Sequence, residues 1–83
     1  MEEAVEHLLP AIAEQLDSPD TPYVRETYER LLEEPDIEDE EARAMIAFCL
    51  VDELEAMTTG ERPFDADRYQ ILLKLLPAMP EGR

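Results

Sequence analysis

The side chains that could do chemistry in this sequence are a run of carboxylates, one histidine and one cysteine. The carboxylates are concentrated in residues 33–41, where seven of nine residues are Asp or Glu. An EF-hand calcium loop would need a glycine at its sixth position and a glutamate at its twelfth. Counted from Asp36, those positions hold Glu41 and Ala47. The run is therefore interpreted as the solvated start of a helix, where carboxylates complement the positive end of the helix dipole.

The single histidine, His7, is the candidate metal ligand. Glu3 precedes it by one helical turn and Glu14 follows it by two, so the three side chains share nearly one helix face. A zinc site takes three or four ligands, and di-metal helical bundles use repeated Glu-x-x-His motifs that this chain lacks. We expect no metal and no cofactor, and we keep a site built on His7 and Glu14 as the alternative.

The only cysteine, Cys49, lies within residues 44–51, which carry no polar side chain. No basic residue nearby in the sequence would activate the thiol, so we interpret it as a small hydrophobic residue. The chain also lacks a phosphate-binding glycine loop and a Ser-His-Asp arrangement. We therefore expect no catalytic residues and no enzyme activity. A single cysteine, after a start without the basic region of a secretory signal, indicates a cytoplasmic protein.

Four helices must position these side chains. Apolar residues at helical spacing, interrupted by prolines, predict helices at about residues 2–17, 22–34, 37–58 and 66–76. Pro10 falls inside the first, where the apolar stripe continues in register, so we expect one kinked helix. The third carries the apolar segment 44–51 and should be central, because a helix that is apolar all round is buried all round. The prediction is one all-α domain, residues 1–83, folded as a compact, mostly antiparallel four-helix bundle.

Local signals indicate where these helices begin and end. Thr21 can cap the second helix before a proline, Asp36 the third and Asp65 the fourth. Gly60 is expected near the C-terminal cap of the third helix. Phe64, in the loop that follows, should fold back onto the core.

The net charge of −15, from 22 acidic and 7 basic residues, limits the partners of the chain. It argues against nucleic acid, whose phosphates need Lys and Arg, and against an anionic membrane surface. No apolar run reaches the roughly 18 residues that span a bilayer. An excess of acidic residues with only one lysine also suits a cell interior of high salt concentration, where charge repulsion is screened. A halophilic source is therefore one explanation of the charge.

Two partner hypotheses remain. The acidic surface could mimic DNA or bind a basic protein, because complementary charge speeds encounter. An apolar stripe left uncovered by four short helices could instead form a homodimer. Tyr23 and Tyr69 are the interface candidates, since tyrosine is enriched in interface cores.

Three segments resemble a bacterial family in their order along the chain: HLLPAIAEQL (7–16), YERLLEE (28–34) and EEARAMI (40–46). Residues 7–55 are similar to the later half of the domain-of-unknown-function family 1841. The resemblance implies an all-helical, cytosolic bacterial domain and supplies no activity. A family pattern HEAxH would stand at residues 40–44, where both histidine positions are lost. The residues that could be carried over are His7, Glu14, Gln15 and Glu41.

The function expected from the sequence is that of a small acidic interaction or structural module without catalysis. The alternative is a carboxylate and histidine metal-binding bundle that uses His7, Glu14 and Glu41. A further alternative is an acidic DNA mimic or a binder of a basic protein.

Overall fold

The computed structural model describes residues 2–78, and this part of the chain contains four helices and no strand. They are α1 (Glu2–Asp17), α2 (Pro22–Leu32), α3 (Asp39–Gly60) and α4 (Ala66–Leu75). The predicted all-α helical bundle is confirmed. The predicted helix ends differ from the observed ones by no more than two residues, as at 34 against 32 and 58 against 60.

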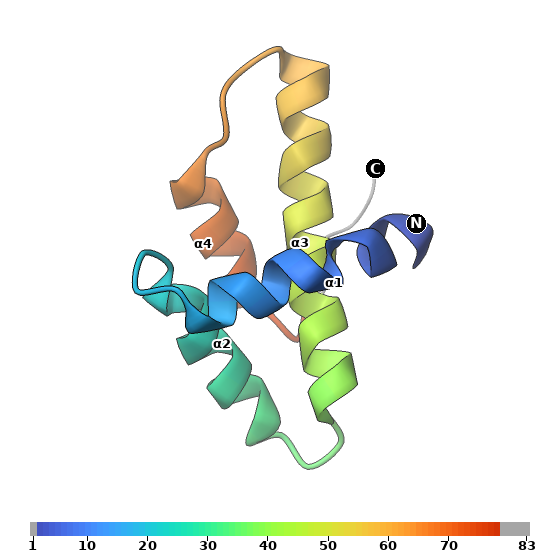
Figure 1. Ribbon diagram of the computed structural model, residues 1–83, viewed down its shortest axis with the longest axis vertical. Coiled ribbons are helices and arrows are strands. Elements are labelled where there is room, and N and C mark those ends of the chain that lie inside the picture. Colours follow the sequence, from blue (N-terminus) through green and yellow to red (C-terminus); the bar gives the residue numbers. More distant parts are fainter. Residues whose placement is uncertain (1, 79–83) are drawn as a thin grey trace.

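Helix α3 is the centre of the bundle and contacts each of the other three helices. In Figure 1, α2, α3 and α4 alternate in direction along the long axis, whereas α1 lies across α3. The core forms where these helices meet. Its buried members are Ile12, Leu16, Val24, Leu31, Ala42, Ile46, Ala47, Cys49, Leu50, Tyr69, Leu73 and Leu76.

The apolar segment of α3 is buried on most of its surface but not all round. Ala44, Met45 and Phe48 stay partly exposed, because the three short neighbours of α3 do not enclose it completely. The expectation of complete burial was therefore wrong at these positions. The core face of α3 contains Ile46 and Leu50, and one turn further along it contains a buried carboxylate, Glu53.

The helix starts follow the sequence signals in part. α1 continues through Pro10 as one helix, and the Asp65 carboxylate caps α4 by accepting a hydrogen bond from the Arg68 N–H (3.1 Å). Thr21 precedes α2, but its hydroxyl donates to the Gln15 carbonyl oxygen (2.9 Å) and so ties α2 to α1. The assignment of Asp36 as the cap of α3 was wrong, because α3 begins later, after Glu38.

The end of α3 lies near Gly60, as predicted, but the cap itself is Glu61. Gly60 is the last helical residue, and Glu61 takes the left-handed conformation that turns the chain (φ 51°). The Glu61 and Arg62 N–H groups both donate to the Met57 carbonyl oxygen and close the helix end. The loop that follows lies alongside the last turns of α3 and brings Phe64 against Tyr69, with ring centroids 5.7 Å apart. Phe64 therefore does fold back, although 39% of it stays exposed.

Candidate functional site

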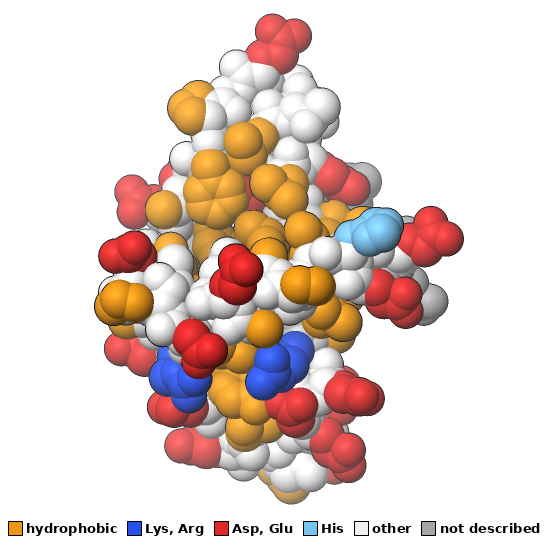
Figure 2. Space-filling view, in the orientation of Figure 1, with side chains coloured by type: hydrophobic (Ala, Val, Ile, Leu, Met, Phe, Trp, Pro, Cys, Tyr) orange, Lys and Arg blue, Asp and Glu red, His pale blue; other side chains and the backbone are white. Residues whose placement is uncertain are grey.

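An open groove of about 550 Å³ lies between α1 and the C-terminal half of α3. Its lining is mostly apolar, and we call it the α1–α3 groove. Figure 2 shows hydrophobic side chains gathered on this face above α1, from α3 across toward the α3–α4 loop, with the histidine at the opposite edge. The lining residues are Ala4, His7, Leu8, Val51, Leu54, Glu55, Thr58 and Thr59.

Helical spacing explains why these residues share one groove. Ala4, His7 and Leu8 stand at positions i, i+3 and i+4 of α1, and Val51 begins the matching row on α3. Both rows mix small residues with large ones, so the two helices leave space between them. The Thr58 hydroxyl donates to the Leu54 carbonyl oxygen (3.3 Å), one turn back in the same helix.

Leu54 is the large apolar residue of α3 that this groove leaves open to solvent, with 37% of its surface exposed. Leu32, on α2, is 39% exposed and does not line the groove. Single exposed leucines are ordinary on protein surfaces, but an exposed leucine inside an apolar groove is typical of a binding site. Leu54 is therefore the first residue to test, and Leu32 is its natural control.

On the other side of α3, the fully buried Glu53 carboxylate accepts four hydrogen bonds. Arg62 donates two of them, at 2.7 and 3.1 Å. The Asp65 N–H and Arg68 donate one each, both at 2.8 Å. Arg68 also pairs with Asp52 (2.6 Å). We call these five residues the Glu53 cluster, and they attach the α3–α4 loop and α4 to the last turns of α3.

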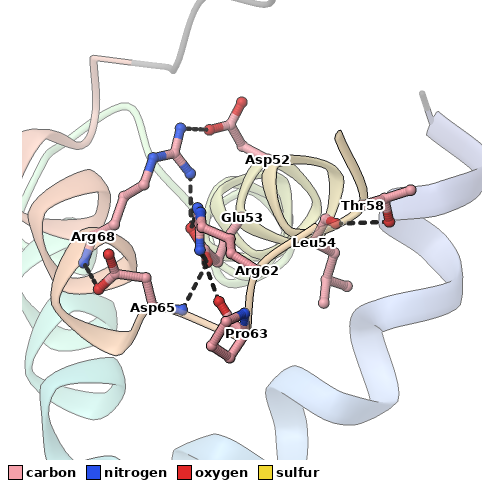
Figure 3. Close-up of polar contacts among 8 residues, drawn as sticks. All are labelled: Asp52, Glu53, Leu54, Thr58, Arg62, Pro63, Asp65 and Arg68. Carbon is pink, nitrogen blue, oxygen red and sulfur yellow. Dashed lines mark hydrogen bonds and ion pairs between the residues drawn. The ribbon is translucent and has the colours of Figure 1, made fainter. Parts of the chain in front are cut away.

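The Glu53 cluster and the groove lie on opposite sides of α3. Figure 3 shows Glu53 pointing toward Arg62 and Arg68, whereas Leu54 and Thr58 lie on the opposite side of α3, toward α1. Hydrogen bonds from Arg62, with those from Asp65 and Arg68, hold the pKa of Glu53 down at about 2, against the opposing effect of burial. The carboxylate is therefore charged at neutral pH and binds both arginines.

Part of the acidic run has a structural role. The Tyr28 hydroxyl donates to Asp39, and the Arg43 guanidinium pairs with the same carboxylate (2.8 Å) while stacking over the Tyr28 ring at 5.4 Å. The Tyr28 hydroxyl and then Arg43 hold the pKa of Asp39 below its ordinary value. Asp39, Glu40 and Glu41 lie in the first turn of α3, so the interpretation of a dipole-complementing helix start is confirmed for these three residues and not for Glu33, Glu34 and Asp36, which precede the helix.

The structure does not bring the candidate metal ligands together. His7 is exposed in the α1–α3 groove, and Glu14 and Glu41 are exposed elsewhere on α1 and α3. Within residues 2–78, no group of three or more His, Cys, Asp or Glu side chains could hold a metal ion. The alternative metal site at His7, Glu14 and Glu41 therefore has no ligand cluster in this part of the chain.

The other candidates are mostly interior. Burial raises the pKa of the Cys49 thiol to about 12, so it stays protonated and unreactive at neutral pH. Tyr69 is 1% exposed, and its hydroxyl donates to the Gln15 side-chain oxygen (2.7 Å). Its proposed role at an interface was wrong, because the ring fills the core. Tyr23 is half-buried against that ring, with centroids 6.1 Å apart.

Sequence reasoning missed Glu53, although the sequence held a signal for it. Glu53 continues the spacing of Ile46 and Leu50 on the core face of α3, where a carboxylate is out of place unless a cation pairs with it. Two of the seven basic residues follow within the next fifteen positions, at Arg62 and Arg68. Their pairing with Glu53 could have been inferred from this pattern.

Comparisons of the chain with protein-family models, with curated proteins and with solved structures find no match. The resemblance to family 1841 therefore stays a prediction. Among the helices of residues 2–78, none is both long and apolar enough to cross a membrane.

Proposed function

We propose that this chain is a non-catalytic interaction module that binds another protein through the α1–α3 groove. The observation that carries the proposal is an open, mostly apolar groove with Leu54 exposed inside it. Contiguous exposed apolar surface is one of the marks of a protein-binding site. We further propose that the protein acts in the cytoplasm, which its single, unpaired and buried cysteine supports.

The groove favours binding over catalysis. Among the residues that line the groove, only His7 and Glu55 have titratable side chains. The Thr58 hydroxyl donates a hydrogen bond to the backbone of its own helix. Nucleophilic catalysis would need a nucleophile within hydrogen-bond reach of its base. The buried, protonated Cys49 does not supply one.

The groove also favours apolar contact over DNA mimicry. A DNA mimic would present rows of carboxylates spaced like phosphates. On the face in Figure 2, most Asp and Glu side chains are scattered around the margin, a few lie over α1, and hydrophobic side chains cover the area above α1. The apolar area above α1 is therefore the feature that we assign to binding.

Site-specific photo-crosslinking tests the proposal. Leu54 is replaced by a photoreactive phenylalanine analogue in one variant and Leu32 in a matched control, and each is irradiated in the cells that make the protein. Because the two leucines are equally exposed, random collisions should label both alike. We expect one protein, identified by mass spectrometry, to be linked through position 54 and not through position 32.

Two results would contradict the proposal. One is equal labelling from both positions, and the other is linkage only between copies of this chain. The metal-binding alternative has its own check, since a chelator should lower the melting temperature of a protein that a bound metal stabilises. We expect the melting temperature to be the same with and without chelator.

A further inference from the structure

The charges around the α1–α3 groove indicate the chemistry of its partner, if the groove binds a protein as proposed above. Glu55 lines the groove, and Glu3, one helical turn before His7 on α1, is exposed. No Lys or Arg is among the lining residues. The wall of the groove is therefore apolar in its middle and negative at its edges.

The nearest arginines along the chain do not offset this charge. Arg62 and Arg68 follow the α3 wall in sequence, but both are paired with Glu53, and Arg68 also with Asp52. In Figure 2 the Lys and Arg side chains of this face lie below α1, away from the hydrophobic surface above it. With a net charge of −15 for the chain, the groove attracts cations and repels another acidic surface.

The shape of the groove selects the conformation of the partner. Its two walls are helices whose backbone N–H and C=O groups bond within the helix, and residues 2–78 contain no strand whose edge could pair with an extended peptide. A helix can instead place apolar side chains at positions i, i+3, i+4 and i+7 into such a groove. Each copy of this chain carries a net charge of −15, so two copies repel each other and a second copy is a poor partner for the groove.

We infer that the α1–α3 groove binds a basic amphipathic helix of a partner protein. Its apolar side chains contact Leu8, Val51 and Leu54, and its Lys or Arg side chains pair with Glu55 and with Glu3 at the rim. The apolar contact supplies most of the affinity, because rim charges mainly steer association and select the partner.

Calorimetric titration with two designed peptides tests this inference. Both have about 18 residues and the same leucine stripe at helical spacing, and their polar positions are all Lys in one and all Glu in the other. Each is titrated into the native protein, Leu54→Ser and the control Leu32→Ser, in dilute buffer and in about 0.5 M NaCl. A third variant, Thr58→Lys, places a positive charge in the groove. It tests the same surface even if Leu54→Ser does not fold.

The expected result has three parts. The Lys peptide binds the native protein and Leu32→Ser with equal affinity, and binds Leu54→Ser and Thr58→Lys at least about tenfold more weakly. Its affinity falls in salt. The Glu peptide binds at least about tenfold more weakly than the Lys peptide.

Any of the following results would overturn the inference. Equal binding of both peptides would show that charge does not select the partner. Equal weakening by Leu54→Ser and Leu32→Ser, or none by either, would place the contact outside the groove. Self-association of the native protein that Leu54→Ser abolishes would make the occupant a second copy. The peptide titration could fail while photo-crosslinking at position 54 remains specific. That combination would reject the basic helical partner and retain the proposed interaction function.

Discussion

At the scale of single residues, Glu53 shows how an acidic protein keeps a carboxylate inside its core. Its side chain is fully buried, while Arg62 and Arg68 keep 31% and 37% of theirs exposed. A buried carboxylate persists only if its oxygens are hydrogen-bonded and its charge is paired, and here four donors do both. The two arginines snorkel, with their stems packed and part of each side chain in water.

Replacing Glu53 with glutamine should destabilise the fold by about 3 kcal/mol, which is the low end for removing one partner of a buried ion pair. The low end applies because both arginines can regain water. The glutamine amide also turns N–H donors toward guanidinium groups that can only donate. Urea unfolding measures the loss, and Glu55→Gln, an exposed neighbour in the same helix, is the control. Equal unfolding midpoints for the two variants would show that the cluster contributes little.

The same carboxylate predicts a particular pH dependence. Its pKa lies near 2 in the folded protein, against an ordinary value of 4.5. A lowered pKa stabilises the fold fully above the unfolded value, and the gain is lost as the pH falls through the folded value. The difference in unfolding free energy between the native protein and Glu53→Gln should therefore be constant above about pH 5 and shrink toward pH 2. A difference that stays unchanged down to pH 2 would contradict this.

At the scale of elements, α3 ends in a conformation that the sequence did not predict. A glycine at the C-terminal cap is the common solution, yet Gly60 remains helical and Glu61 adopts the positive φ. A residue with a side chain pays for this conformation in steric strain. A carboxylate also stands unfavourably at the negative end of the helix dipole. This turn directs Arg62 back to Glu53, so the strained residue and the buried cluster belong to the same feature.

The substitution Glu61→Gly should therefore stabilise the fold, by about 0.5–1 kcal/mol after the added flexibility of the unfolded chain is subtracted. Glu61→Gln is the matched control, because it removes the charge and leaves the strain. Thermal unfolding of both variants separates the two contributions. A glycine variant no more stable than the glutamine variant would show that strain at Glu61 is negligible.

The elements were predictable because their signals are local. Apolar spacing and prolines place all four helices, and the central position of α3 follows from residues 44–51. The crossing of α1 over α3 and the groove that it leaves depend on how Leu8 and Val51 pack across two helices. The Glu53 cluster joins residues up to fifteen positions apart in sequence. Periodicity within α3 can indicate that Glu53 faces the core and needs a cation, but it contains no information about how α1 packs across α3.

At the scale of the whole molecule, the charge of −15 on 83 residues opposes folding through self-repulsion. Ion pairs within the described residues, such as those of Arg25, Arg43 and the Glu53 cluster, offset only a part of the 22 acidic side chains. Surface pairs contribute little individually. The expectation of a high-salt environment and the expectation of a basic partner both begin from this unbalanced charge.

Salt should consequently raise the melting temperature. The rise should be steep up to about 0.15 M NaCl and should flatten beyond it, because the screening length falls from about 30 Å at 0.01 M to about 8 Å there. A gain that instead grows in proportion to salt up to about 1 M would reflect exclusion of salt from apolar surface rather than screening. A melting temperature that falls with salt would show that attractive pairs outweigh repulsion.

The most direct test of a groove-binding function is an amide chemical-shift map of the protein titrated with the Lys peptide. If the α1–α3 groove is the binding surface, the largest shifts should cluster at residues 4–8 and 51–59, on the two facing walls. The exposed apolar side chains of α4, Ile71 and Leu75, provide an internal comparison, since both are more exposed than Leu54. Shifts centred on those residues, or spread evenly over the acidic surface, would contradict the account.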